Sequence, residues 1–96
     1  MVDVKACSAL AQETRKKIIE ELLKEKTHAS ELARKINIDR PTICYHLAML
    51  ENASLVSGNY VILEHHSPGR AAKIYEVNEE KYVQTLKELK QMSTLL

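Results

Sequence analysis

The segment spanning residues 30–56 constrains the fold most, because its apolar pattern predicts two short helices separated by a tight corner. The apolar face of the first helix is formed by Leu32, Ala33 and Ile36. Asn37 follows the last turn, where a left-handed residue ends many helices and Asn can replace Gly. Asp39 is suited to cap the next helix, and Pro41 fits its first turn because the missing N–H would be unpaired there. The second helix is therefore predicted to begin at about Arg40.

The second helix is predicted to present a polar face opposite its buried side. Ile43, Leu47 and Leu50 recur at i, i+4 and i+7, which indicates the side that packs on the core. Two helices joined in this way form a helix-turn-helix, whose second helix is sized for the DNA major groove, about 12 Å wide. The outer side chains offer donors and acceptors for base edges and phosphates. The helix residues predicted to contact DNA, with Cys44 and His46 on the two flanks, are Arg40, Pro41, Thr42, Cys44, Tyr45, His46 and Met49.

A β-hairpin is predicted after the second helix. Residues 55–63 and 72–77 are rich in β-branched and aliphatic side chains, and the Pro68-Gly69 pair between them marks a turn. Residues 65–75 include basic side chains but no acid. An arm of that sign can lie along the phosphates beside the groove, although a hairpin that is basic by chance is the alternative. The hairpin residues predicted to contact DNA are His66, Arg70 and Lys73.

The chain resembles the ArsR family of winged helix-turn-helix regulators along nearly its whole length. Residues 9–23 contain Ala-Leu-Ala, then Thr-Arg, then Ile and Leu at helical spacing, which is similar to the family's opening pattern. Residues 30–33 and 41–47 match its reading unit, and residues 69–75 match its wing. The resemblance implies one winged helix-turn-helix domain over residues 1–96, mainly α-helical with a small β-hairpin (α+β). It also implies a homodimeric transcription regulator, expected to be a repressor, with one reading helix per half of an inverted repeat.

Four positions depart from the family pattern. His28 stands where the family often has Ser or Thr to cap the first helix of the reading unit, and Ser54 stands where it often has Gly. Because Ser in a left-handed position costs about 1 kcal/mol or less relative to Gly, we expect Ser54→Gly to stabilise the fold. Cys44 and Tyr45 replace the usual Ser and the usual Arg or His of the reading helix. The base specificity of relatives therefore does not transfer to this chain.

The two ends of the chain are predicted to form a dimer interface. An amphipathic helix starts at about Glu79, and its apolar stripe extends to the last residue, further than a small monomer core requires. The resemblance implies that the first and last helices pack across a two-fold axis; a stripe folded back on its own core is the alternative. The predicted interface residues are Val4, Cys7, Leu10, Tyr82, Val83, Leu86, Leu89, Met92 and Leu96.

Composition adds limits on location and charge. The formal net charge is only +1, so any basic surface must be local. With no apolar stretch of about 18 residues and no signal-like start, we expect a cytoplasmic protein without a membrane segment. Cys7 and Cys44 are far apart in the sequence and are expected to be free thiols.

The metal-ligand patterns common in the family are missing. The first reading helix has no cysteine, and no histidine follows His66. A site between subunits built on Cys7 or Cys44 stays open, since thiolates suit soft and borderline ions. Cys44 is interpreted first as a small apolar filler; the alternative is a redox switch, in which oxidation at the groove edge blocks DNA and the nearby His46 favours the thiolate.

No arrangement of side chains in the sequence indicates an enzyme. Cys44 and His46 face different directions on a helix, and the chain has no glycine-rich phosphate loop. We therefore expect no catalytic residues, no cofactor and no resident metal. The main alternative to DNA binding is a winged-helix module that docks another protein through the outward Tyr45 and Met49. A small-molecule or redox effector is compatible with the sequence, which identifies neither the effector nor the operator.

Overall fold

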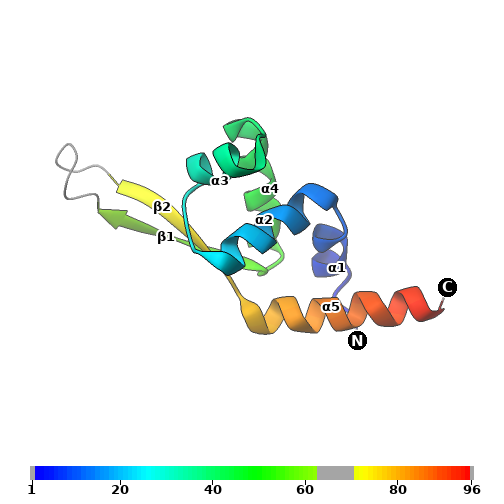
Figure 1. Cartoon of the computed structure of the whole chain (residues 1–96). Helices are drawn as coiled ribbons and strands as arrows, with labels where there is room; N and C mark the ends of the chain where they lie inside the picture. Colours follow the sequence, from blue (N-terminus) through cyan, green and yellow to red (C-terminus); the bar gives the residue numbers. More distant parts are fainter. Residues whose placement is uncertain (1, 63–70, 96) are drawn as a thin grey trace.

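A group of helices, a β-hairpin and a long final helix form the protein, as seen in a computed structural model that describes residues 2–62 and 71–95 (Figure 1). The hairpin projects from one end of the helices, and the final helix runs along one side of the body (Figure 1). The elements in chain order are α1 (Val4–Leu10), α2 (Glu13–Lys24), α3 (Ala29–Ile36), α4 (Arg40–Asn52), β1 (Val56–Ile62), β2 (Ala71–Val77) and α5 (Glu79–Leu95).

The apolar core lies among the first four helices and the base of the hairpin. Its completely buried aliphatic side chains are Leu10, Ile18, Ile19, Leu32, Ile43, Leu47, Leu50 and Leu55. The predicted buried side of α4 is therefore confirmed. Ala33, Ile36 and Ile38 are half-buried against the same core, so the apolar face of α3 and the corner after it also pack inward.

The two predicted strands form an antiparallel hairpin. Cross-strand pairs run from Val56 with Val77 at the base to Ile62 with Ala71 at the far end. The connection between α2 and α3 anchors β2, because the Thr27 N–H donates to the Tyr75 carbonyl at 3.3 Å and the Tyr75 N–H donates to the Thr27 carbonyl at 2.8 Å. The turn predicted at Pro68-Gly69 lies outside the described residues.

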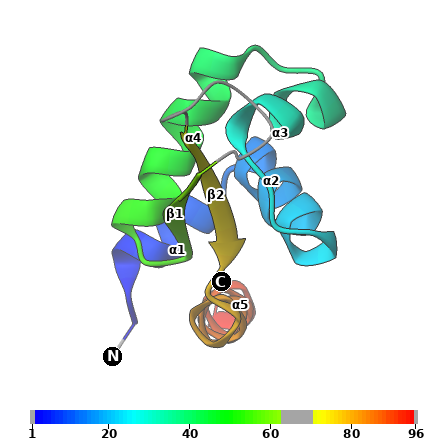
Figure 2. The same cartoon turned by 90° about the vertical axis from the view of Figure 1, so that its left-hand side faces the viewer.

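Asn78 fixes the start of α5, which begins at Glu79 as predicted. Its backbone N–H donates to the Leu55 carbonyl at 2.9 Å, and its amide nitrogen donates to the Ser54 carbonyl at 3.2 Å. Its side-chain oxygen accepts the Lys81 N–H at 3.2 Å and so caps the helix. From there α5 passes alongside α1, and Figure 2 shows it end-on, on the side of the body away from α3.

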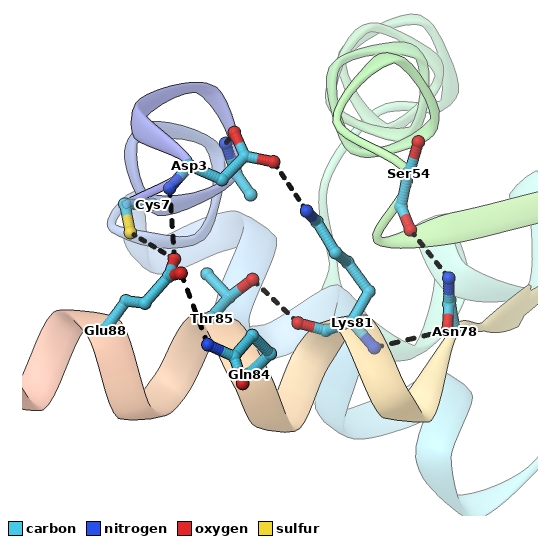
Figure 3. Close-up of polar contacts among 9 residues, drawn as sticks. Asp3, Cys7, Ser54, Asn78, Lys81, Gln84, Thr85 and Glu88 are labelled. Carbon is cyan, nitrogen blue, oxygen red and sulfur yellow. Dashed lines mark hydrogen bonds and ion pairs between the residues drawn. The ribbon is translucent and has the colours of Figure 1, made fainter. Parts of the chain in front are cut away.

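A polar cluster joins α5 to the N-terminal segment (Figure 3). Lys81 forms an ion pair with Asp3, and the buried Glu88 carboxylate accepts the Asp3 N–H at 3.3 Å and the Cys7 thiol at 3.7 Å. The buried Thr85 hydroxyl donates to the Lys81 carbonyl at 2.7 Å. The face of α5 toward α1 therefore contains hydrogen-bonded polar groups as well as the apolar residues that the sequence indicates.

Two residues assigned to the dimer interface from the sequence are buried within the chain itself. Leu10 belongs to the core, and Cys7 is covered on the α5 side by Glu88. The prediction that Cys7 and Leu10 face a second chain is wrong, because Leu10 packs in the chain's own core and α5 covers Cys7. Among residues 2–62 and 71–95, no helix has the length and apolar character needed to cross a membrane.

Candidate nucleic-acid interface

The corner between α3 and α4 has the predicted geometry. Asn37 adopts a left-handed conformation (φ 62°, ψ 47°) and ends α3. The Asp39 carboxylate accepts the Thr42 N–H at 3.1 Å and the Thr42 hydroxyl at 2.9 Å, so it caps α4 twice. These hydrogen bonds hold the pKa of Asp39 below its ordinary value. Arg40 and Pro41 follow as the first helical residues, which confirms the predicted start.

His28 serves as the N-cap of α3 although its side chain is an imidazole. Its Nδ1 atom accepts the Glu31 N–H at 3.2 Å, which is the bond that a Ser or Thr oxygen makes in a common cap. Glu31 is also paired with Arg34 on the outer face of the helix, and that guanidinium lowers the pKa of Glu31. The departure from the family pattern therefore preserves the cap.

The outer face of α4 is open to solvent as predicted. Arg40, Pro41 and Tyr45 are exposed, and the Tyr45 side chain is the largest apolar group on this face at 58% exposure. Thr42 and Met49 are half-buried at its edges. The Thr42 hydroxyl donates to Asp39, so an approaching base can use it as an acceptor.

His46 is buried, contrary to the prediction from the sequence. It is only 7% exposed, and its Nδ1 atom accepts a hydrogen bond from Arg15 Nε at 3.1 Å. The prediction that His46 contacts DNA is wrong, because the start of α2 covers the flank of α4 on which the helical spacing placed it. Burial first, and the nearby Arg15 charge second, lower the pKa of His46.

Both cysteines are free thiols, as predicted. Cys44 is half-buried against the core, which agrees with the interpretation as a filler, and its proposed redox role stays a prediction. Burial, followed by the Glu88 charge, raises the pKa of the Cys7 thiol and keeps it protonated. Within the described part of the chain, no three His, Cys, Asp or Glu side chains are grouped to hold a metal ion.

Lys73, the one predicted hairpin contact inside the described residues, is not a free cation. It pairs with Glu51 of α4 at 3.0 Å, and its ammonium lies 5.2 Å from the centre of the Tyr75 ring. The Glu51 hydrogen bond raises the pKa of Lys73. The sequence predicted a basic arm with no acidic partner. For Lys73 that prediction is wrong, because Glu51, which lies outside the hairpin, pairs with its charge. His66 and Arg70 lie outside the described residues.

A groove of about 570 Å³ separates the hairpin from the starts of α3 and α4, and its lining includes Ser30, Arg40, Cys44, Tyr60, Lys73 and Tyr75. Tyr60, which the sequence analysis did not single out, is 75% exposed on this wall. Its strand position opposite Lys73 was the available signal, because cross-strand partners share one face of a hairpin. Arg15 belongs to the Thr-Arg pair of the family's opening pattern, but nothing in its local spacing indicated a contact with α4.

Exposed apolar side chains lie on α1 and on α5, and we refer to them together as the exposed apolar surface. Val4 is 71% exposed, and Val83, Leu86 and Met92 are exposed on α5. The remaining predicted interface residues of α5 differ: Tyr82 and Leu89 are half-buried against the chain's own core, and Leu96 lies outside the described residues.

Comparisons with known proteins agree with this geometry. Residues 12–57 match the model of the family described as "Bacterial regulatory protein, arsR family". The chain is 35% identical over 79 residues to an uncharacterized HTH-type transcriptional regulator of Methanocaldococcus jannaschii, an alignment that covers 82% of this chain and 79% of that protein.

Solved structures show the same fold. An ArsR-like transcriptional regulator from Rhodococcus sp. RHA1 superposes with a TM-score of 0.71 at 28% identity, covering 94% of this chain and 77% of that one. A homodimeric winged helix-turn-helix DNA-binding domain from Mycobacterium bovis, a possible ArsR-family regulator, superposes with a TM-score of 0.68 at 17% identity, covering 95% and 79%.

Proposed function

Because this chain belongs to the ArsR family of winged helix-turn-helix transcriptional regulators, we propose that it acts as a homodimeric repressor that binds an inverted-repeat operator. In this proposal α4 enters the major groove and the hairpin lies along the adjacent backbone. The α4 residues that face the duplex are Arg40, Pro41, Thr42, Cys44, Tyr45 and Met49. Lys73, His66 and Arg70 act from the hairpin, and the pairing with Glu51 weakens the attraction of Lys73 for phosphates.

The main support for the proposal is that α4 has one buried face and one solvent-exposed face. Ile43, Leu47 and Leu50 are completely buried, whereas Tyr45 projects into solvent on the other side and no described element covers it. A helix that is anchored in a core and open at its polar start is the arrangement with which helix-turn-helix proteins read base edges. Arg40 makes none of the ion pairs seen among the described residues, so its charge is available to phosphates.

The dimer is supported by the exposed apolar surface on α1 and α5. Val4, Val83, Leu86 and Met92 present side chains that a monomer leaves in water. The Mycobacterium bovis domain, which shares this fold, is homodimeric. A two-fold pair presents two copies of α4, and such pairs read half-sites roughly 34–36 Å apart.

The test is selection of bound fragments from a random DNA pool, followed by titration of the selected site at two salt concentrations. We expect affinity to fall steeply with salt, because each neutralised phosphate releases counterions. Arg40→Ala should weaken all sequences similarly, whereas Tyr45→Ala should change preference at particular base pairs by about 1 kcal/mol or more.

Lys26→Ala is the charge-matched control, since Lys26 is exposed beside the start of α5 and outside the proposed contact residues. Wild-type protein that selects no sequence and binds DNA without salt dependence would overturn the proposal in favour of a protein-docking module. Repression is checked by transcription in vitro from a promoter containing the selected site, where added protein should lower transcript yield.

A further inference from the structure

Arg15 is a buried cation outside the helix-turn-helix. It is 8% exposed, near the start of α2, and it takes part in none of the ion pairs among the described residues. Its partners are neutral: Nε donates to His46 Nδ1 at 3.1 Å, and Nη1 donates to the Ala9 carbonyl at 3.4 Å. A buried charge is costly without compensation, so this arrangement calls for a physical reason.

The guanidinium of Arg15 also lies behind the exposed Tyr45 side chain of α4. Its central carbon is 5.9 Å from the centre of the Tyr45 ring, within reach of a cation–π interaction. The His46 ring meets the same tyrosine edge-on, with ring centres 5.3 Å apart and planes inclined by 64°. Arg15 and His46 therefore contact the inner side of a ring whose outer side faces solvent.

We propose that Arg15 is a positioning residue for DNA reading, which holds the Tyr45 ring in its binding orientation through direct contact and through His46. The inference rests on the proposed function, in which Tyr45 reads base edges. An exposed tyrosine that is fixed before binding loses less conformational freedom on contact with DNA, which is worth about two- to tenfold in affinity. Specificity gains as well, because only one ring orientation meets the bases.

The hydrogen bond to Arg15 also determines the chemical form of His46. A guanidinium can only donate, so His46 Nδ1 must be unprotonated and its single proton must sit on Nε2. Protonated His46 cannot accept this bond and would place a second positive charge beside Arg15. Removal of Arg15 frees both tautomers, and the ring beneath Tyr45 then loses its fixed orientation.

The first experiment needs no DNA. Nitrogen-15 spectra of the histidine side chains, with His46 assigned from the His46→Gln variant, report the protonation of each ring nitrogen. We expect unprotonated Nδ1 in the wild type and a mixture of tautomers in Arg15→Met. Lys17→Met, which removes an exposed charge from the same helix, should leave the wild-type spectrum unchanged. An unaltered His46 tautomer in Arg15→Met overturns the proposal.

The second experiment compares base preferences from selection on a random DNA pool. Arg15→Met should lose about two- to tenfold in specific affinity and relax preference at the same base pairs as Tyr45→Ala, whereas Lys17→Met should keep the wild-type profile. Should Arg15→Met fail to fold, Arg15→Lys replaces it. Lysine keeps the positive charge but lacks the planar group beneath Tyr45, so preference at the same base pairs should relax by a smaller factor. An unchanged profile in the folded Arg15 variant overturns the inference, whereas loss of all sequence selection by the wild type would instead refute the proposed function.

Discussion

Replacement of Gly58 by alanine tests the packing between the hairpin and α4. A Cβ atom at this position lies 2.4 Å from Lys73 Cε and 3.1 Å from Tyr75 Cε1. The first distance is far inside van der Waals contact, so the Lys73 side chain must move away. We expect that movement to break its ion pair with Glu51. The buried Tyr75 ring must shift by a few tenths of an ångström in addition.

Two costs and one gain set the size of the effect. The ion pair is partly exposed on both sides and is worth about 0.5–1 kcal/mol. The shift of Tyr75 lies at the low end of overpacking strain, about 1 kcal/mol. Alanine returns about 0.5–1 kcal/mol, because it restricts the unfolded chain more than glycine does. The free energy of unfolding should therefore fall by about 1 kcal/mol, a drop of roughly 4–8 °C in Tm.

A double-mutant cycle identifies the cause. Urea unfolding, followed by circular dichroism at one fixed protein concentration, is measured for Gly58→Ala alone and in a Lys73→Ala background. In that background the ion pair and the Cε atom are already gone, so the alanine should cost about 0 kcal/mol. Equal costs of Gly58→Ala in the two backgrounds would refute the steric explanation.

Three further predictions concern other parts of the molecule. Ser54 has a left-handed φ of 62°, so Ser54→Gly should raise the free energy of unfolding by about 1 kcal/mol or less. Asn37→Gly should gain less, because Asn tolerates this conformation. A fall in Tm for Ser54→Gly would contradict the left-handed conformation of Ser54. Because the pKa of His46 is lowered in the folded protein, the unfolded chain takes up a proton at this residue below about pH 6.5 while the folded chain stays neutral. The free energy of unfolding should therefore decrease as the pH falls from about 6.5 through the pKa of His46 in the folded protein. Denaturant titrations at several pH values should show a smaller loss in His46→Gln, and equal losses would count against a buried neutral His46. Leu86→Glu should convert the dimer to a monomer in sedimentation experiments, whereas the same change at the comparably exposed Leu23 of α2 should not; a dimer that persists in Leu86→Glu would place the interface elsewhere.

The elements with local signals could be predicted from the sequence. The left-handed Asn37, the Asp39 cap and the apolar spacing of α4 each depend on neighbours within a few residues, and all three are confirmed. Asn78 differs from these residues, because its side chain both caps α5 at Lys81 and binds the Ser54 carbonyl. The sequence predicted only the helix that follows Asn78.

The features that could not be predicted involve distant partners. His46 is buried because Arg15, 31 positions earlier, covers its side of α4. Lys73 loses its free charge to Glu51, 22 positions earlier. Glu88 is polar yet buried, because the N-terminal segment brings a backbone N–H and a thiol to its carboxylate. Helical spacing says which side of a helix a residue occupies, but only packing decides which sides are covered.

Asn78 has a mechanical consequence. It is hydrogen-bonded to Ser54, Leu55 and Lys81, so a single side chain and its backbone join the end of α4, the return from the hairpin and the first turn of α5. The start of α5 is therefore hydrogen-bonded to the residues that directly follow the end of α4. Asn78 is therefore a shared attachment point for α5 and for the residues that follow α4, the helix that carries Tyr45.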